Sequence, residues 1–359
     1  MDFEEDEKLV FWVGTLASIT ERLGSTDLRT RISALQDANE LFAKNFSVPQ
    51  IDKELNNFVL QVDECIFNYE SIEEHNLAFS VFAHIAINIG AAFGECWTMV
   101  FNKMAPELFS TDEEKIQRIE KLGLITIFSA KTAAIIKDSV NQLLQFALRA
   151  DPTYELMKAD VDSLSIILCT FPAILTRKDV FSLSVQLMNT LLATREVNES
   201  LLGIRMFITL LEGLKYLENN EIEFTCSSQK FVAQTKSKLS DLQGFKALRK
   251  ALSNAQDLIA GKQFITTLNL NDQSVEITGH PREFILEAVE KLYPENFQKQ
   301  LIKNPLLQSF LSIELMSAQE VRNLRNRFKF EINMDRKKLS KDRDLELQKK
   351  RNQKDTPDE

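Results

Sequence analysis

A similar sequence pattern recurs along the first two thirds of this chain. Each copy consists of polar residues typical of a helix N-terminus, followed by an apolar helical segment. The copies begin near residues 24, 71, 110, 157 and 197, so the intervals between them are 47, 39, 47 and 40 residues. Periods of this size are typical of armadillo and HEAT units, whose helices bury their apolar faces only against neighbouring repeats. We therefore predict an armadillo/HEAT-like helical solenoid over residues 1–222.

The residues at the start of the copies support this interpretation. Ser71 with Glu74, and Thr111 with Glu114, have the spacing of a capping box, in which two side chains satisfy free backbone N–H groups at a helix start. Apolar residues follow at helical spacing, and we expect most of the 25 phenylalanines to lie in the core between repeats.

Composition favours a mainly α protein. Among 359 residues there are only 10 glycines and 8 prolines, well below average usage of about 7% and 5%. The tight turns that all-β folds require are therefore scarce. Residues 77–94 carry no charge and are long enough to be considered as a membrane span, but Ser80, His84, Asn88 and Gly90 interrupt them, so we predict a buried solenoid helix.

The compartment is predicted from the cysteines and the first residues. Cys65, Cys96, Cys169 and Cys226 match no metal-ligand spacing and no compact disulfide framework, so we expect reduced, buried thiols. The N-terminus is acidic, whereas a signal or transit peptide would be basic. We expect an intracellular protein, in the cytoplasm, with the nucleus as the alternative.

The pattern changes after residue 222. Residues 223–244 are polar and lysine-bearing, and are predicted to be a linker or an exposed helix. Residues 245–316 are predicted to form a small α+β C-terminal module: a helix over 245–258, a hairpin with strands at 264–270 and 275–278, a helix over 282–292, and a helical stretch over 297–313 interrupted at Pro305.

A basic segment ends the chain. Residues 317–354 contain neither glycine nor proline and begin with a capping box, Ser317 to Glu320, so residues 317–359 are predicted to be a long basic C-terminal helix and tail. Residues 322–354 hold 13 basic and 5 acidic side chains, whereas residues 1–321 hold 30 basic and 44 acidic. Beyond Arg336 few residues are apolar, so we expect this half to project and to order on a partner.

A basic arm on an acidic body predicts that one element contacts a polyanion. Because these cations spread around the predicted helix, they suit a phosphate-lined tunnel; the alternative is an ordinary solvated helix. Lys236, Lys238, Lys246, Arg249 and Lys250 form a second basic cluster that is also a candidate for contact with a polyanion, and Lys246, Arg249 and Lys250 of this cluster share a helix face. The candidate RNA-binding residues are Arg322, Arg325, Arg327, Lys329, Arg336, Lys337, Lys338, Lys341, Arg343, Lys349, Lys350 and Arg351 in the arm, and Lys246, Arg249 and Lys250 in the second cluster.

The order of these C-terminal elements resembles the interferon-related developmental regulator family. The shared features are a helix with basic residues from Phe245, two short strands at Ile265 and Val275, a helix, an Asn-x-Leu-Leu segment at Asn304, and the basic end. The chain departs from the family at Gly279-His280, where a tryptophan is usual, and at residues 292–296, where a glycine-rich turn is usual. It resembles a divergent member.

The resemblance implies two non-enzymatic activities. In one, the body covers transfer-RNA positions of translationally inactive ribosomes and the C-terminal helix enters the messenger-RNA channel. We expect this activity, with ribosomal RNA and ribosomal proteins as partners, and with idle ribosomes inactivated or preserved. The alternative is a nuclear transcriptional co-regulator that acts as a protein-interaction scaffold.

Residues for catalysis are missing from the sequence. His75, His84 and His280 are the only histidines, and no phosphate-binding glycine loop or paired-ligand motif is present. We expect His84 to be a hydrogen-bonded core histidine, and we expect the acidic runs 4–6, 73–74 and 113–114 to be solvated caps and tails. The prediction is a monomer that is not an enzyme, with no cofactor, metal, membrane contact or small-molecule substrate.

Overall fold

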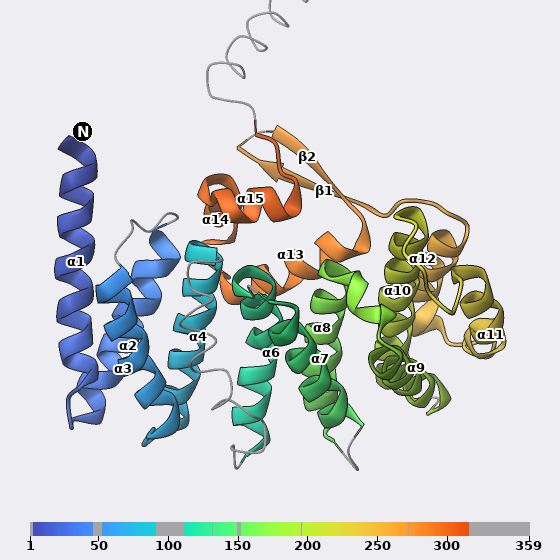
Figure 1. The fold of residues 1–359 in the computed structure, drawn as a ribbon, viewed down its shortest axis with the longest axis horizontal. Helices are drawn as coiled ribbons and strands as arrows, with labels where there is room; N and C mark the ends of the chain where they lie inside the picture. The colour runs from blue at the N-terminus through green and yellow to red at the C-terminus, as the bar shows by residue number, and fades with distance from the viewer. Residues whose placement is uncertain are drawn as a thin grey trace, which may run out of the picture. The chain divides into compact units, whose positions relative to one another are not determined.

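Two layers of stacked helices make up the first part of the molecule (Figure 1). The computed structural model describes residues 3–45, 52–90, 111–130, 132–148, 152–194, 196–271 and 273–315. One layer, called here the even-numbered layer, contains helices that each pack on the next: α2 (Leu28–Lys44), α4 (Ile72–Ile89), α6 (Asp112–Ser129), α8 (Tyr154–Thr170) and α10 (Val197–Asn219). The other layer contains α1 (Phe3–Leu23), α3 (Asp52–Phe67), α7 (Ala133–Ala147), the 3₁₀ turn η4 (Pro172–Thr176) and α9 (Lys178–Ala193).

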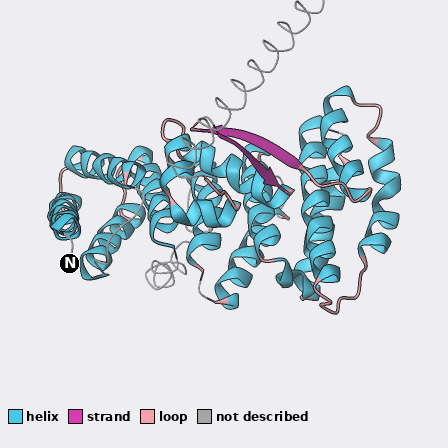
Figure 2. Ribbon diagram, turned by 90° about the horizontal axis from the view of Figure 1, so that it is seen from above, coloured by secondary structure: helices cyan, strands magenta, loops and turns pink. Residues whose placement is uncertain are grey.

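This arrangement confirms the predicted fold class, a mainly α, armadillo/HEAT-like solenoid. Figure 2, seen from above, shows the helices side by side in succession from the N-terminus. Helices of one layer fit against those of the other, α3 on α4 and α7 on α8 for example, so that each repeat buries its apolar stripe between its neighbours.

The repeat length is visible in the helix starts of the even-numbered layer. The residues that precede its five helices are Asp27, Ser71, Thr111, Thr153 and Glu196, at intervals of 44, 40, 42 and 43 residues. The first three accept a hydrogen bond from a backbone N–H of the first turn, and the capping box predicted for Thr111 and Glu114 is complete. The copies predicted from the sequence therefore correspond to structural repeats. The spacing of the helix starts in the structure is more regular than the spacing of the sequence copies.

Polar side chains join successive helices of this layer across one repeat length. Thr209 Oγ1 donates to Ser165 Oγ at 3.0 Å, and the Ser163 hydroxyl donates to the Ile119 carbonyl. Arg31 Nε lies 2.5 Å from Glu74 Oε1, in an ion pair that is largely buried. A buried hydrogen bond fixes the register of two packed helices, because leaving either partner unpaired costs about 1–3 kcal/mol.

The apolar core between repeats is rich in aromatic residues, as predicted. Among the fully buried side chains are Phe42, Phe58, Phe79, Phe82 and Phe207. The uncharged segment predicted as a core helix is confirmed for its described part, α4, which is buried along most of its length. No helix in the described residues is long and apolar enough to cross a membrane.

The prediction that the acidic pairs are solvated caps was wrong for one member of each described pair. Glu73 and Glu113 are exposed, but Glu74 is fully buried and Glu114 is 3% exposed. Glu74 is paired with Arg31, and Glu114 accepts a hydrogen bond from the Tyr69 hydroxyl. Both carboxylates thus bind a preceding repeat. Glu114 also accepts from the Thr111 N–H and completes its capping box, whereas Glu74 accepts from the Glu70 N–H, so the capping box predicted for Ser71 and Glu74 is only half formed.

The segment after residue 222 continues the helical packing before the hairpin. Of the two alternatives for residues 223–244, the structure contains a helix, α11 (Ser228–Asp241), whose Phe231 and Leu239 are buried. The 3₁₀ turn η5 (Lys246–Leu248) and α12 (Arg249–Ile259) follow, with Leu248, Leu252 and Ala255 on the buried side as the sequence predicted.

The predicted hairpin is present as β1 (Ile265–Leu270) and β2 (Gln273–Thr278), an antiparallel pair. Leu270 pairs with Gln273, so the connection is two residues long and shorter than the predicted turn over residues 271–274. Asn271 has φ of +50°, the left-handed conformation that asparagine tolerates and that tight hairpins require.

The last described residues run back along the even-numbered layer. This return segment, residues 280–313, contains α13 (His280–Leu292), α14 (Phe297–Lys303) and α15 (Pro305–Leu311). α13 packs on α10, α8 and α6, and α15 packs on α4. Figure 1 shows these helices in orange across the ends of the blue and green helices. Residues Met1–Ile313 form one compact unit, and the predicted C-terminal helix over residues 317–359 lies outside the described residues.

Close helix packing at Gly203 provides a stability test. A Cβ added to Gly203 of α10 would lie 2.8 Å from Leu192 Cδ2 and 3.0 Å from its backbone nitrogen. We expect Gly203→Ala to lower the free energy of unfolding by about 1–2 kcal/mol, because overpacking costs about 1–3 kcal/mol and outweighs the better helix propensity of alanine. Urea denaturation measures the change.

The matched control is Gly14→Ala in α1, where no heavy atom lies within 4 Å of the added Cβ. We expect this variant to gain about 0.5–1 kcal/mol, since alanine favours a helix over glycine. Equal effects of the two substitutions would contradict the packing described for α9 and α10.

Candidate functional site

The candidate residues of the basic arm, from Arg322 to Arg351, all lie outside the described residues. The structure therefore places only the second predicted cluster, Lys246, Arg249 and Lys250. All three are exposed, and none has an ion-pair or hydrogen-bond partner within the part of the chain that the structure describes. They lie on η5 and at the first two positions of α12, where no acidic residue is present in the first turn. Their charges thus add to the positive end of the helix dipole.

The two neighbouring lysines on α11 differ from each other. Lys236 is exposed, whereas the half-buried Lys238 donates to Asn189 Oδ1 of α9 at 2.6 Å. The structure thus leaves Lys236 open to solvent and ties Lys238 into the packing of α11 on the preceding repeat.

A buried amide cluster holds the return segment on the solenoid, and Asn304 is at its centre. Its Nδ2 donates to Asn88 Oδ1 of α4 at 3.0 Å and to Gln300 Oε1 at 3.1 Å. Its Oδ1 accepts from the backbone N–H groups of Leu306 and Leu307, which caps α15. Asn304 and Gln300 are both fully buried. The Asn304 side chain therefore caps the start of α15 and at the same time anchors the connection between α14 and α15 to α4.

The side-chain amides of Asn88 and Gln300 extend this cluster to α2. Asn88 Nδ2 donates to the Phe42 carbonyl at 2.8 Å, and Gln300 Nε2 donates to the Ala43 carbonyl at 3.0 Å. Both acceptors are near the C-terminal end of α2, where free carbonyls need partners. Sequence analysis singled out Asn304 only as part of a family-like segment, and no local signal indicated Asn88 or Gln300.

The imidazole ring of His84 packs against the return segment. It is 5% exposed, and its ring stacks on Tyr293 with centroids 4.6 Å apart and planes at 26°. Burial lowers the pKa of His84 to about 4, and the backbone of Leu292 opposes this change only in part. The predicted core position of His84 is confirmed, and the imidazole is neutral at pH 7.

A cavity of about 290 Å³ lies where α13 crosses α6, α8 and α10. A chain of alternating charges closes one side of it: Lys291 contacts Asp162 at 3.2 Å, Asp162 contacts Arg205 at 3.1 Å, and Arg205 contacts Glu287 at 2.8 Å. The Arg205 guanidinium also lies 4.0 Å from the centroid of the Phe284 ring, a cation–π distance. These contacts hold α13 in place above the cavity.

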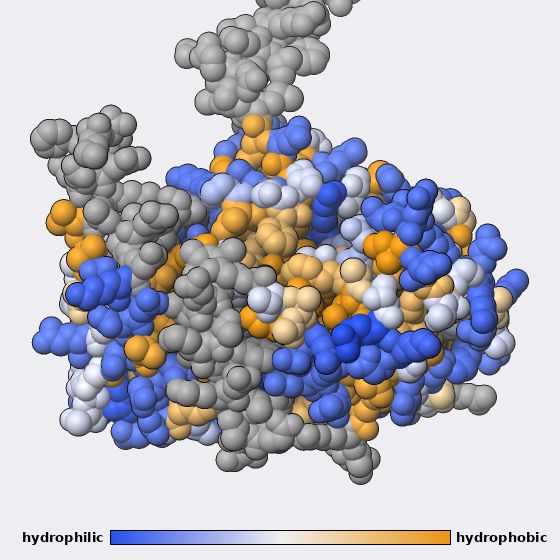
Figure 3. Space-filling model, in the orientation of Figure 1, coloured by the Kyte–Doolittle hydropathy of each residue, from blue (hydrophilic) through white to orange (hydrophobic). Residues whose placement is uncertain are grey.

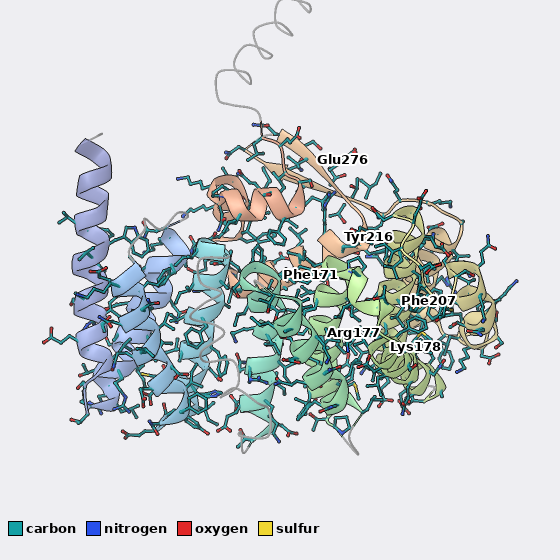
Figure 4. The ribbon with its side chains drawn as sticks, in the orientation of Figure 1. Phe171, Arg177, Lys178, Phe207, Tyr216 and Glu276 are labelled. Atoms are coloured by element: carbon teal, nitrogen blue, oxygen red, sulfur yellow. The ribbon has the colours of Figure 1, made fainter. Side chains whose placement is uncertain are left out.

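A separate apolar groove of about 700 Å³ lies between the N-terminal end of α7, η4 and α10. Figure 4 labels three of its residues, Phe171, Arg177 and Tyr216. Tyr216 is 48% exposed. Figure 3 shows apolar residues gathered across the middle of this view of the molecule, with hydrophilic residues around them. Contiguous exposed apolar surface of this kind marks protein–protein contact sites in many soluble proteins.

Metal-binding geometry does not occur in the part of the chain that the structure describes, since no group of three or more His, Cys, Asp or Glu side chains could hold an ion there. Three of the four cysteines are described, and they are free: Cys65 is buried, and Cys169 and Cys226 are partly so. Burial raises the pKa of Cys65 to about 12, so the thiol is protonated and unreactive at neutral pH.

Comparison with known proteins gives structural similarity alone. No protein-family model matches the chain, and no curated protein matches it. Among the 23 solved chains that match, a designed armadillo repeat protein in complex with the peptide (KR)4 is 14% identical, with 68% of this chain and 98% of that chain covered and a TM-score of 0.44. A second designed armadillo repeat protein is 15% identical over 67% of this chain and 98% of its own, with a TM-score of 0.41.

A natural solenoid is also similar to this chain. The structure of Kap121p bound to Nup53p matches at 11% identity, with 80% of this chain and 42% of that chain covered and a TM-score of 0.38. The assignment of helical repeats rests on the packing and the cap spacing described above.

The amide cluster can be tested by removing its central side chain. We expect Asn304→Ala to lower the free energy of unfolding by about 2–4 kcal/mol, because it removes a helix cap and deprives the buried Asn88 Oδ1 of the Asn304 donor. Hydrogen exchange of the α14 and α15 amides should rise with it. Asn296→Ala is the control, since Asn296 precedes α14 without a capping hydrogen bond; a change above about 0.5 kcal/mol there would contradict the assignment.

The buried imidazole predicts a pH dependence. The pKa of His84 is lowered in the folded state, so the unfolded chain binds the proton more readily, and stability falls as pH drops from 6.5 towards 4. The loss should reach about 3 kcal/mol. His84→Phe keeps an aromatic ring against Tyr293 and removes the titration, so its unfolding free energy should change less over this range. Parallel pH profiles for the two proteins would show that His84 does not titrate as described.

Proposed function

We propose that this protein is a non-enzymatic binding scaffold that acts on ribosomes as a divergent member of the interferon-related developmental regulator family. In this proposal it occupies transfer-RNA sites and the messenger-RNA channel of idle ribosomes. It inactivates or preserves them by steric competition, without turnover. The solenoid serves as a rigid body that positions the basic C-terminal segment.

The observation that carries the proposal is the contrast in charge along the chain. Residues 322–354 hold 13 basic and 5 acidic side chains, next to a body in which acidic residues exceed basic ones, 44 to 30. A concentrated positive segment on a negative body favours contact with a polyanion through that segment and disfavours non-specific coating of the body by nucleic acid.

The exposed cluster on η5 and α12 supports a second contact. Lys246, Arg249 and Lys250 have no neutralising partner among the described residues, and on the opposite side of the same helix Leu252 is buried. Cations held this way on a rigid helix lose little conformational freedom when they bind phosphate, compared with cations on a mobile loop.

The alternative function, a transcriptional co-regulator that binds proteins along its solenoid face, receives less support. Extended ligands of solenoids bind along a surface formed by one layer of stacked helices. In this chain the return segment already covers the even-numbered layer from α10 back to α4. A protein partner would therefore need another surface, such as the apolar groove between α7, η4 and α10.

Sedimentation of a cell lysate through a sucrose gradient tests the proposal. We expect the protein with non-translating monosomes at low salt and free at high salt. If about six phosphates are contacted, the logarithm of the binding constant should fall with the logarithm of salt concentration with a slope of roughly −4. Charge reversal of Arg336, Lys337, Lys338 and Lys341 to glutamate should abolish co-sedimentation, and reversal of Lys246, Arg249 and Lys250 should weaken it.

The control reverses three exposed lysines on other helices, Lys53, Lys158 and Lys178, and changes the net charge by the same amount as reversal of the α12 cluster. We expect this control to co-sediment as the natural protein does. A protein that stays at the top of the gradient at low salt, or an arm variant that still co-sediments, would refute the ribosomal proposal and favour the protein-scaffold alternative.

A further inference from the structure

The cavity under α13 contains a buried cation that forms no ion pair with any described residue. Lys121 of α6 lines this cavity and is 9% exposed. Its ammonium donates only to the carbonyl and side-chain oxygen of Gln117, one turn earlier in the same helix. No carboxylate among the described residues pairs with it. Burying an unpaired charge is costly, so such a group in a cavity needs an explanation.

The other charged groups around the cavity are occupied or more distant. Asp162 is shared between Arg205 and Lys291, and Glu287 is paired with Arg205. Glu120 also lines the cavity and favours the charged form of Lys121, but its carboxylate is beyond ion-pair distance. The lysine is thus the one lining cation in this described cavity with no direct carboxylate partner.

The apolar part of the wall comes from three helices. It is formed by Leu124 of α6, Ile166 of α8, and Phe284, Ala288 and Leu292 of α13, and the uncharged polar side chains of Ser80 and Gln117 also line the cavity. The volume of about 290 Å³ is near the lower end for small-molecule sites, which are mostly apolar with a few fixed polar groups. A buried cation without a carboxylate partner, in a cavity that also has an apolar wall, has the chemistry of a site for a small organic acid.

We propose that this Lys121 cavity binds a small carboxylate with an apolar body, with the carboxylate on the Lys121 ammonium and the apolar part against Ile166 and Phe284. The ligand supplies the missing counter-charge and fills the space under α13. Because α13 forms one wall, binding also stabilises the docking of the return segment on α6 and α8. This inference is independent of ribosome binding.

Ionisation of the lysine gives the site a pH dependence. Burial lowers the pKa of Lys121 to about 8, so the ammonium is present at pH 7 and is lost as pH rises above 8. A carboxylate ligand favours the ammonium, and its affinity therefore decreases through this range. A neutral ligand of the same shape has no such dependence.

The test uses the full chain, with sodium benzoate as the probe and benzamide as its neutral counterpart, in isothermal titration calorimetry at pH 7 and pH 9. We expect benzoate to bind at pH 7, and benzamide to bind at least about tenfold more weakly, as expected for loss of a charged hydrogen bond. Lys121→Met should weaken benzoate binding by a similar factor. Ala288→Leu, which keeps the lysine and fills the cavity, should also abolish binding.

The matched control is Lys158→Met, at an exposed position on α8 away from the cavity lining; it should bind benzoate as the natural protein does. Circular dichroism checks that each variant is folded, and if Lys121→Met does not fold, Ala288→Leu and the pH dependence decide. The proposal is overturned if benzoate does not bind at pH 7, if benzamide binds equally well, or if a folded Lys121→Met or Ala288→Leu variant keeps its benzoate affinity.

Discussion

Close stacking of α2, α4, α6, α8 and α10 is the constraint on which the rest of this structure depends. α8 meets α6 and α10 through small polar side chains spaced one repeat apart, Ser163 on the Ile119 carbonyl and Thr209 on Ser165. These contacts let the helix backbones approach closely and fix their register, while phenylalanine and aliphatic residues fill the space between the layers. The result is a continuous surface on which a later part of the chain can lie.

Much of the fold could be predicted because its signals are local. Capping residues such as Ser71 and Thr111 can be recognised as helix starts from the few residues around them. Regular spacing between such starts indicates repeats. The hairpin was predictable for the same reason, since β-branched residues alternate on either side of an asparagine-containing turn. His84 was placed in the core because an apolar helix surrounds it in the sequence.

The features that could not be predicted depend on contacts between distant residues. Glu74 has the same sequence context whether it is solvated or buried, and its partner Arg31 lies 43 residues earlier. Asn304 before a proline suggests a cap, but nothing near it indicates that its amide reaches Asn88. Lys121 is one of many lysines on amphipathic helices, and its unusual environment is formed by residues from distant helices that meet at the cavity. The candidate RNA-binding arm was found from charge alone, and its residues lie outside those that the structure describes.

The return segment has a consequence for how the molecule is made. A simple repeat array can begin to fold as soon as its first units leave the synthetic machinery, because each unit needs only its neighbours. In this protein Gln300 bonds to the carbonyl of Ala43, 257 residues earlier. The first repeats therefore gain these last contacts only after nearly the whole compact unit has been synthesised. A nascent chain that stops before α14 leaves the Ala43 carbonyl and Asn88 Oδ1 without the donors that Gln300 and Asn304 provide.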